Sequence, residues 1–556
     1  MKPKLYQLAL LLIMLCCLIV PVRAKDPTAK GSAEAGSAAN PNTLHEIDSA
    51  VRNKISPELL EQFLEVEETV GSAASDQVER PPETLETSEG APITYLVFLR
   101  DRADLRTLQA IPDKETRRAA LVDRLRNVAR RSQTKVLDYL AERTEQGKVS
   151  RYTSYWIFNG LVVESDLETA LELARHPEVE ALRPNRIHRL PEPQQDTDAT
   201  LDAGEVAWNV AHIEADRVWS TLGITGQGVV VANMDSGVDW THPALQHRYR
   251  GYDAEDPAAS VHDYNWFDPT GTYPQTPGPN IPEISDWSDH GTHTMGTMVG
   301  STDGYTVGVA PGAQWIAVKV FDDGGEAEEE WIHAGFQWCL APTDMDGENP
   351  DPRKAPDIVN NSWGDREDVS DETFRQDLEA WRAAGILSVW AAGNSGPDEG
   401  TINSPAGMET AFAVGAVDES DTIAYFSSRG PSPWVEIKPD VVAPGVNITS
   451  SIAGGAYGMM SGTSMATPHV AGLAALMWEA MGDTRSITST EQTIISTAIG
   501  DDEPDTTYGY GRIDAYEAVA TAIREKHSFY MPIILKHAAL QPKPFDHVAL
   551  MPLIYK

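Results

Sequence analysis

Five short runs of apolar residues between positions 206 and 525 constrain the fold of this chain more than any other feature. Each run is apolar on both faces, as expected of strands in a parallel sheet that is covered on both sides. Segments with a helical period, near 290–300, 327–340, 371–385 and 464–481, separate most of the runs. This alternation predicts an α/β domain with a doubly wound, mostly parallel sheet. The runs are GVVVANM (228–234), WIAVKVF (315–321), PDIVNNSWG (356–364), ILSVWAAGN (386–394) and AFAVGAVD (411–418).

A second folded unit is predicted between residues 91 and 190. ITYLVFL (93–99) predicts a strand, and a long helix, a strand or hairpin, a second helix and a closing strand follow it. This is the β-α-β-β-α-β order of a ferredoxin-like α+β sandwich. Residues 100–151 carry 14 Lys or Arg against 8 Asp or Glu, whereas the whole chain has a net charge of -39. The contrast favours a module that docks on the acidic remainder of the chain, and a solvated basic helix face explains it equally well.

The two ends of the chain differ in composition from these domains. Residues 1–24 contain two lysines, an apolar core and a small-residue cleavage site, which together predict a signal peptide and therefore export. Residues 25–90 are rich in Ala, Ser, Pro, Thr and Glu and predict a low-complexity linker with one helical patch, SPELLEQFLEVEE. Residues 526–556 form a tail with a short repeat, MPIILK and MPLIYK, which could pack on the body or hold the protein at the cell surface.

Charge and cysteine content exclude several kinds of partner and bond. A strongly acidic chain is repelled by nucleic acid and by anionic lipid, so neither is expected as a partner. Cys16 and Cys17 leave with the predicted signal peptide, and Cys339 then has no partner for an intrachain disulfide. No other apolar run is long enough to cross a bilayer, so no transmembrane anchor is expected after removal of the signal.

Four polar residues stand where a sheet of this kind binds its ligands, at the carboxyl ends of strands and the starts of helices. Asp235 ends one buried run, and Asn394 ends another in a glycine-bounded turn. His290 begins a helix rich in glycine and threonine, and Ser464 lies among tiny residues at the first turn of an apolar helix. Each residue alone could be a cap or part of a turn.

As a set, the four residues have complementary chemical roles. A serine hydroxyl is a poor nucleophile until a base takes its proton, and a buried carboxylate orients that base and stabilises its charged form. Unpaired N–H groups at a helix start can donate to an oxyanion, and a nearby amide adds a second donor. Asp235, His290 and Ser464, with Asn394 beside them, therefore predict a site for acyl transfer that needs no cofactor.

The chain order Asp, His, Ser with these flanks resembles the subtilisin-like serine proteases. The matching stretches are DSGVD, HGTHTMGTMVG, GVAPGAQWIAVKV, AAGN and GTSMATPHVAG, within residues 206–525. The resemblance implies that Asp235 orients the base, His290 is the general base and acid, and Ser464 is the nucleophile. It implies further that Asn394 donates to the oxyanion, and that the protein hydrolyses peptide bonds.

The resemblance also implies further parts of the molecule. Residues 91–190 are similar to the family's inhibitory propeptide, so a secreted endopeptidase made as a self-processed precursor is expected, cut within 188–208. Backbone near NNSWG and AAGN would line the pocket for the substrate residue before the cut. The residues expected in that pocket are Asn361, Ser362, Trp363, Gly364 and Gly393.

Two features depart from the family pattern. Ala244 stands close to a position where many subtilisins have an aspartate that binds calcium, and the loop completing that site is short. The usual strong calcium site is therefore doubtful, while a structural calcium elsewhere stays open. The segment FDDGGEAEEEW (321–331) brings acidic residues to the subsites upstream of the cut. It either favours basic substrate residues or is a solvated loop.

Two other functions fit parts of the sequence. A metallohydrolase could use His290 and His293, but the H-x-x-H spacing lacks the H-E-x-x-H pattern and an obvious third ligand. The family resemblance instead makes His293 structural. A degenerate protease scaffold that only binds or adheres would require a defect at the site, and all four predicted catalytic residues are present.

Overall fold

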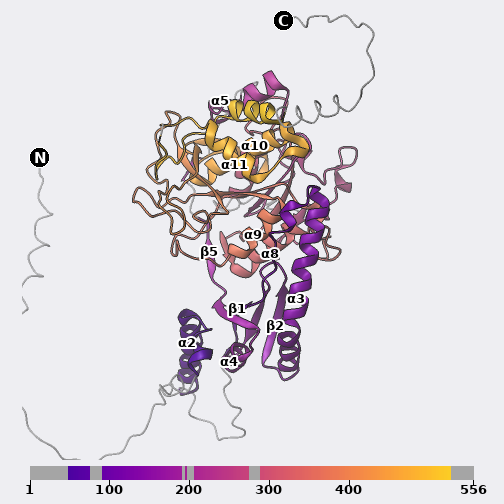
Figure 1. Ribbon diagram of the computed structural model, residues 1–556, viewed down its shortest axis with the longest axis vertical. Helices are drawn as coiled ribbons and strands as arrows, with labels where there is room; N and C mark the ends of the chain where they lie inside the picture. Colours follow the sequence, from indigo (N-terminus) through magenta and orange to yellow (C-terminus); the bar gives the residue numbers. More distant parts are fainter. Residues whose placement is uncertain are drawn as a thin grey trace, which may run out of the picture.

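A computed structural model describes two folded domains and a short helical segment before them (Figure 1). The predicted signal peptide and the tail beyond residue 526 lie outside the described residues. Within the described part of the chain, no helix combines the length and apolarity needed to span a membrane. The described residues are 48–75, 91–190, 194–196, 206–274, 289–501 and 503–526.

The α/β domain is built on a seven-stranded sheet with the order β14-β13-β12-β11-β7-β9-β8, and its neighbouring strands are parallel. Strands β8 and β9 lie on one side of β7 and β11 to β14 on the other, so the strand order changes direction beside β7, where such sheets bind ligands. All five apolar runs are strands of this sheet, which confirms the predicted architecture. The strands are β7 (Val230–Asp235), β8 (Trp266–Phe267), β9 (Gln314–Lys319), β11 (Ile358–Asn361), β12 (Leu387–Ala391), β13 (Phe412–Val417) and β14 (Val441–Pro444).

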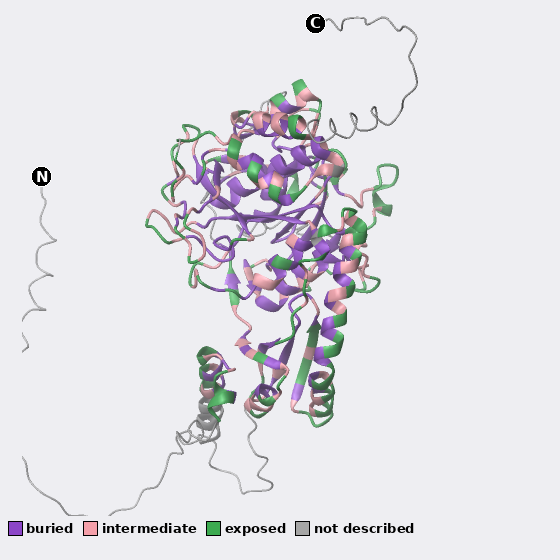
Figure 2. Ribbon diagram, viewed as in Figure 1, coloured by how far each residue is buried: buried purple, intermediate pink, exposed green. Residues whose placement is uncertain are grey.

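Helices cover both faces of this sheet, which forms a buried layer in the middle of the domain (Figure 2). Helices α7 (His290–Val299) and α10 (Thr463–Met481) share one hydrophobic core, and α8 (Glu329–Leu340) and α9 (Arg375–Ala384) share the other. The four predicted helical segments are therefore confirmed. Shorter elements complete the domain: α5 (Trp208–His212), α6 (Ala215–Arg217), η2 (Val218–Leu222), η3 (Gln246–Arg248), η4 (Pro257–Ala259), η5 (Pro352–Lys354), η6 (Ala453–Gly455), η7 (Gly482–Thr484), α11 (Ile487–Thr497) and a helix over 515–526.

The α+β domain has a four-stranded antiparallel sheet with the order β2-β3-β1-β4. Asp113 and Asp166 cap its two main helices, each accepting a hydrogen bond from a backbone N–H in the first turn. The first helix, α3, has 32 residues and extends beyond the sheet alongside the α/β domain (Figure 1). The elements are β1 (Ile93–Leu99), η1 (Leu108–Ala110), α3 (Lys114–Glu145), β2 (Val149–Tyr155), β3 (Gly160–Ser165), α4 (Leu167–Arg175) and β4 (Val179–Pro184).

Part of the segment predicted as linker is packed structure, which corrects that prediction. Helices α1 (Ser49–Arg52) and α2 (Pro57–Ser75) lie within residues 25–90. Leu59 and Phe63 are buried in the same hydrophobic core as one face of the α+β sheet. The apolar residues of SPELLEQFLEVEE recur at helical spacing, and this local pattern outweighs the linker-like composition around it.

The two domains share a hydrophobic core. Phe98 of β1 and Phe158 of the turn between β2 and β3 are buried together with Phe336 of α8 and Trp381 of α9. After β4 the chain continues along the α/β domain through two short antiparallel pairings. Strand β5 (Ile187–Arg189) pairs with β10 (Glu326–Glu328), and β6 (Gln194–Asp196) pairs with β16 (Ala456–Ser461), itself paired with β15 (Ile448–Ile452).

Candidate active site

Asp235 and His290 form the centre of the candidate site. Nδ1 of His290 lies 2.8 Å from Oδ1 of Asp235, and both side chains are buried. The same carboxylate accepts a hydrogen bond from the backbone N–H of Ser236 at 2.6 Å and one from the Thr294 hydroxyl at 3.4 Å. A carboxylate acceptor at Nδ1 favours the tautomer with its proton there, which leaves Nε2 of the imidazole as the base.

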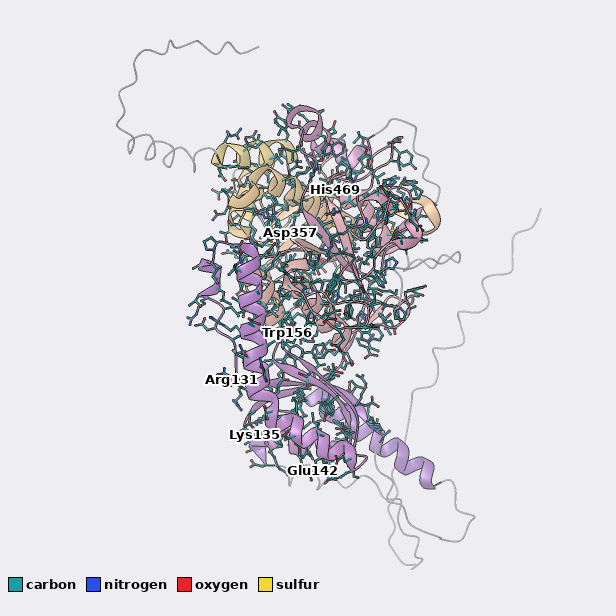
Figure 3. All side chains as sticks on the ribbon, turned by 90° about the vertical axis from the view of Figure 1, so that its right-hand side faces the viewer. Arg131, Lys135, Glu142, Trp156, Asp357 and His469 are labelled. Carbon is teal, nitrogen blue, oxygen red and sulfur yellow. The ribbon has the colours of Figure 1, made fainter. Side chains whose placement is uncertain are left out.

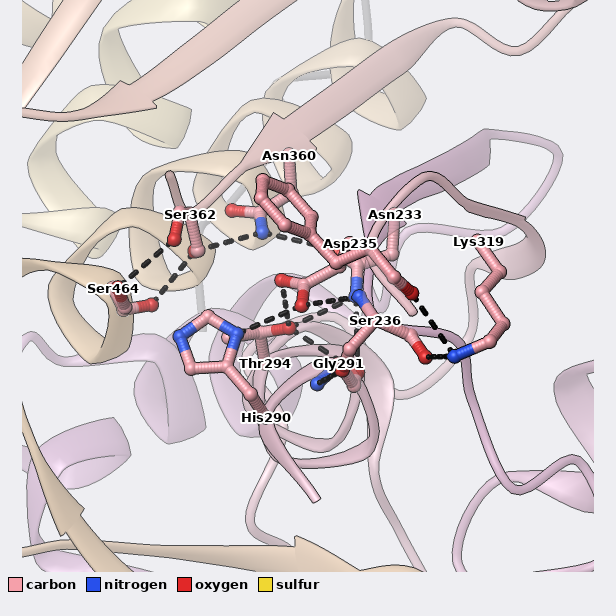
Figure 4. Close-up of polar contacts among 11 residues, drawn as sticks. Asn233, Asp235, Ser236, His290, Gly291, Thr294, Lys319, Asn360, Ser362 and Ser464 are labelled. Carbon is pink, nitrogen blue, oxygen red and sulfur yellow. Dashed lines mark hydrogen bonds and ion pairs between the residues drawn. The ribbon is translucent and has the colours of Figure 1, made fainter. Parts of the chain in front are cut away.

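Ser464 lies on the other side of the imidazole ring (Figure 4). Nε2 of His290 is buried and has no hydrogen-bond partner among the described residues. The Ser464 hydroxyl donates to the carbonyl oxygen of Ser362 at 2.9 Å, and the Ser362 hydroxyl donates to the carbonyl oxygen of Ser464 at 2.8 Å. Rotation about the Cα–Cβ bond of Ser464 turns its hydroxyl toward the base, and such catalytic hydrogen bonds often form only when substrate binds.

Asn394 and the start of α10 surround a small space in front of Ser464. Oδ1 of Asn394 accepts hydrogen bonds from the backbone N–H and the hydroxyl of Thr463, both at 2.9 Å, which leaves its Nδ2 group to face elsewhere. The position that a Cβ atom would take on Gly462 is 3.4 Å from Nδ2 of Asn394 and 3.7 Å from the backbone nitrogen of Ser464. Two N–H groups therefore lie close to the space that glycine leaves beside Ser464, and their role as oxyanion donors stays a prediction.

Comparison with known proteins agrees with this geometry. A sequence profile of the Subtilase family matches residues 226–511, which include Asp235, His290, Asn394 and Ser464. The chain belongs to the subtilase family. It is therefore a serine endopeptidase of the subtilisin type, as its motifs predicted.

Three relatives of this subtilase show how far the similarity extends. Bacillopeptidase F of Bacillus subtilis (strain 168) is 38% identical over 516 residues, which are 88% of this chain and 34% of that protein. Subtilisin E of the same strain is 32% identical over 372 residues, 66% of this chain and 82% of that protein. Serine protease AprX, also of that strain, is 36% identical over 326 residues, 53% of this chain and 67% of that protein. The subtilase thus spans about a third of bacillopeptidase F and most of subtilisin E.

Three of the predicted pocket residues adjoin the site through their backbone. Ser362 contacts Ser464 directly. Gly364 and Gly393 lie so close to Asn403 that an added Cβ would come within 3.0 and 2.4 Å of its side chain, so both positions need glycine. The backbone N–H of Gly393 donates to the Thr463 hydroxyl at 3.2 Å, and its carbonyl oxygen accepts from the N–H of Ser428 at 2.9 Å, so a contact of this wall with a peptide stays a prediction.

The other two pocket residues, Asn361 and Trp363, direct their side chains into the protein. The amide nitrogen of Asn361 donates to the carbonyl oxygens of Val359 and Val389, at 3.2 and 3.3 Å. Trp363 is buried against the rings of Phe321 and Trp390 and in the shared core. Their side chains support the wall of the site, and only their backbone can contact a substrate.

His293 follows His290 by one turn of α7, and its side chain packs away from the predicted nucleophile. Nε2 of His293 lies 2.9 Å from the carbonyl oxygen of Ile448, and burial lowers its pKa to about 3, so the ring is neutral. Among the described residues, no group of three or more His, Cys, Asp or Glu side chains is arranged to hold a metal ion. Ala244 is buried, and the calcium content stays a prediction.

A buried lysine beside the site was not predicted. Lys319 ends β9, and its Nζ donates to the carbonyl oxygens of Ser236 and Phe321 and to the carboxylate of Asp323, at 2.8, 3.0 and 2.9 Å. Figure 4 shows Lys319 beside Ser236 in the turn after Asp235, and its bond to Asp323 joins this turn to the acidic segment. Lys319 is the single charged residue in the apolar run WIAVKVF, and this exception to the pattern could have indicated a buried lysine with specific partners.

Carboxylates of the acidic segment 321–331 form ion pairs with basic residues of the α+β domain, so the segment is not a solvated loop. Oε1 of Glu326 lies 2.7 Å from Nη2 of Arg189, beside the pairing of β5 with β10. Glu330 binds Arg151 with two hydrogen bonds, at 2.6 and 2.8 Å. At Arg151, a basic residue of the segment 100–151 contacts an acidic residue of the α/β domain, as the docking alternative predicted.

Proposed function

We propose that this subtilase is exported, is made as a precursor, and cuts itself where its α+β domain joins its α/β domain. The observation that carries the proposal is the buried His290 ring, with Nδ1 held 2.8 Å from Asp235 and Nε2 open toward Ser464. Residues 1–24, with their signal-peptide pattern, support export. The substrates are peptide bonds of protein chains.

Each of the four residues has one role in the proposed reaction. Nε2 of His290 takes the proton of the Ser464 hydroxyl while the hydroxyl oxygen attacks the substrate carbonyl carbon. Nδ2 of Asn394 and the N–H of Ser464 donate to the negative oxygen that forms. The imidazolium then gives its proton to the leaving amine, the C–N bond breaks, and an acyl ester remains on Ser464. Water, deprotonated by the same ring, hydrolyses the ester and restores the hydroxyl.

The α+β domain fits the role of a ferredoxin-like inhibitory propeptide. Its β-α-β-β-α-β order and antiparallel β2-β3-β1-β4 sheet suit that fold. Its hydrophobic contact with α8 and α9 stabilises its binding to the α/β domain. The backbone N–H of Leu190 donates to the carbonyl oxygen of Gly325 at 2.9 Å, which extends the pairing of β5 with β10. A chain added to a strand in this way occupies the place of a peptide substrate.

The pairing of β6 supports a cut between Leu190 and Gln194. In this pairing Gln194 is opposite Ser461, three residues before the nucleophile Ser464. The chain is therefore held on one side of the interval by β10 and on the other by β16. A cut inside this interval is therefore proposed, and it lies within the predicted 188–208 region.

The test is the intact mass and N-terminal sequence of the purified precursor lacking residues 1–24, as wild type and as Ser464→Ala. Conversion of the wild type alone, with a new terminus between residues 191 and 194, supports both the nucleophile and self-processing. Conversion of both proteins means that another protease makes the cut. Conversion of neither favours a degenerate scaffold that binds without cutting.

The C-terminal residues 526–556 are proposed to act in localisation. The repeat of MPIILK and MPLIYK gives this tail two similar apolar segments, which lie outside the described residues. Truncation after residue 526 is expected to reduce retention at the cell surface without changing peptidase activity. Loss of folding in the truncated protein would assign the tail to the core instead.

A further inference from the structure

The N-terminal half of α3 makes a second contact with the α/β domain, far along the sheet from Ser464. The helix packs on η5 and α9, beyond the edge of its own sheet. Figure 3 shows it leaving the α+β domain past Lys135 and Arg131 and continuing along the α/β domain toward Asp357. Asp357 immediately precedes β11, whereas Asp235 ends β7, so this contact lies at the amino end of the parallel sheet and the active site at its carboxyl end.

Arg118 of α3 is inserted into the α/β domain at this contact, with 1% of its side chain exposed. Its guanidinium donates to the carbonyl oxygens of Ala355, Pro356 and Ala384, at 2.9, 2.6 and 3.4 Å, and Nη2 also lies 3.5 Å from Oδ1 of Asp357. We call these three carbonyl groups and the Asp357 carboxylate the Arg118 socket. Each guanidinium nitrogen therefore has an acceptor on the other domain.

The acceptors of the Arg118 socket are suited to a cation. Ala384 is the last residue of α9, and carbonyl groups at a helix C-terminus lack intrahelical partners and carry partial negative charge. Burial by itself raises the pKa of Asp357, but the neighbouring cations of Arg118 and Lys114 lower it below its ordinary value, so the carboxylate is ionised. The socket thus offers three neutral acceptors and one negative charge to a planar guanidinium.

Asp357 connects the socket to the central strands. Its Oδ2 accepts from the backbone N–H of Val230 at 3.2 Å, and its carbonyl oxygen accepts from the N–H of Leu387 at 3.0 Å. Two of the cations at Oδ1, Lys114 at 2.7 Å and Arg118, come from α3, and Arg485 at 3.7 Å belongs to the α/β domain. When α3 dissociates from the α/β domain, Asp357 loses the charges of Lys114 and Arg118 and becomes exposed to solvent.

Other arginines of α3 have partners inside their own domain. Arg130 is exposed and donates to the side chain of Asn127, and Arg124 donates to the carbonyl oxygen of Asp104 and the hydroxyl of Thr107. Arg118 differs from them in that its acceptors all belong to the α/β domain. A general attraction between a basic helix and an acidic domain does not explain such a matched site.

We propose that the Arg118 socket is a second binding site for the α+β domain, separate from the active site, which keeps that domain bound after the chain between residues 190 and 194 has been cut. The proposal rests on the proposed function for the cut itself. Cutting frees the ends of β5 and β6 but changes nothing at the socket. Dissociation has to pull a buried, hydrogen-bonded charge away from its acceptors, and those acceptors have no partners until water reaches them. The Arg118 socket therefore slows dissociation of the α+β domain.

The test makes the cut independent of the chain's own activity. In the full chain carrying Ser464→Ala, the recognition sequence of an unrelated site-specific protease is inserted within residues 191–193, and that protease then cuts there. Dissociation of the two fragments after dilution is followed by size-exclusion chromatography. We expect the parent fragments to stay together and Arg118→Gln to release the α+β domain about tenfold faster or more.

Two variants on the same helix make the outcome decisive. Arg130→Gln removes an exposed arginine of α3 and is expected to leave the release rate unchanged. Arg118→Lys keeps a charge but loses the planar set of donors, and an intermediate rate is expected. Thermal unfolding before the cut shows which variants are folded. If Arg118→Gln does not fold, the release rate of Arg118→Lys is compared with the parent instead.

Either of two results would overturn the proposal. One is rapid separation of the parent fragments, and the other is release from the folded Arg118 variant within about twofold of the Arg130→Gln rate. Because the added protease makes the cut, failure of self-processing in the wild type does not affect this result. Loss of the socket effect would likewise leave the test of self-processing intact.

Discussion

Nδ2 of Asn394 lies 3.4 Å from the point where a Cβ atom on Gly462 would stand. The space beside Gly462 thus adjoins the proposed oxyanion donors, Nδ2 of Asn394 and the backbone N–H of Ser464. Gly462→Ala fills that space with a methyl group and is expected to lower kcat about 10²-fold, on the scale of losing one oxyanion donor. Steady-state kinetics on a peptide substrate measures the loss. Gly304→Ala, whose added Cβ would meet only Thr302 at 3.7 Å, is the control.

Asn394→Ala removes a donor that acts mainly in the transition state. We expect kcat to fall about 10² to 10³-fold with little change in KM, because the oxygen carries its full charge only after attack. Ser464→Ala sets the lower limit of activity, at a loss of about 10⁶-fold, the scale of this substitution in subtilisin. An Asn394→Ala protein that binds substrate poorly but retains its turnover would contradict the assignment.

His188 makes docking of the α+β domain depend on pH. It is buried, with Nε2 3.4 Å from Glu329 and Nδ1 3.7 Å from Asp365. Burial acts to lower its pKa, but the hydrogen bond and charge of Glu329, with Asp365 and Asp371 nearby, raise it above the ordinary value. The protonated ring is therefore favoured in the docked state. Its contribution to stability is complete below the ordinary pKa of about 6.5 and is lost as pH rises through the raised value.

Thermal unfolding of the Ser464→Ala precursor between about pH 6 and pH 9 tests this dependence. The parent is expected to lose more stability with rising pH than the same protein carrying His188→Gln. His247→Gln, at an exposed position of the α/β domain, should follow the parent. Identical pH profiles for the parent and His188→Gln would show that the ring is not charged in the docked state.

Lys319 supports the turn that follows Asp235. Lys319→Met removes three hydrogen bonds and leaves the buried carbonyl oxygens of Ser236 and Phe321 without this donor. We expect the free energy of unfolding to fall by about 1–3 kcal/mol. Urea denaturation of the Ser464→Ala precursor measures this, with Lys354→Met at an exposed position as the comparison. Equal midpoints for the two lysine variants would mean that water replaces the lost donor without cost.

The sequence by itself determined the α/β architecture and the four residues of the candidate active site. Strands buried on both faces are apolar throughout, so the five runs were visible without any long-range information. Asp235, His290 and Ser464 could be recognised because each stands in a short motif with glycine or other small neighbours. Asn394 could be recognised for the same reason.

Only the tertiary structure decided which side chains point inward and which segments meet. Asn361 and Trp363 belong to the motif NNSWG, yet their side chains turn into the protein, because the main chain at the end of β11 and just after it sets the direction of each one. Residues 48–75 look like linker in composition, and their packing follows from a sheet that begins 18 residues later, at Ile93.

Arg118 is the clearest case of a residue whose role only the tertiary structure reveals. It is one of 14 cations between residues 100 and 151, and nothing in its neighbours distinguishes it. Three of its four acceptors are backbone carbonyl oxygens, which every residue possesses, so no sequence pattern marks them. They become a socket only when the end of α9 and the start of β11 are brought together by folding, which is a property of the assembled sheet.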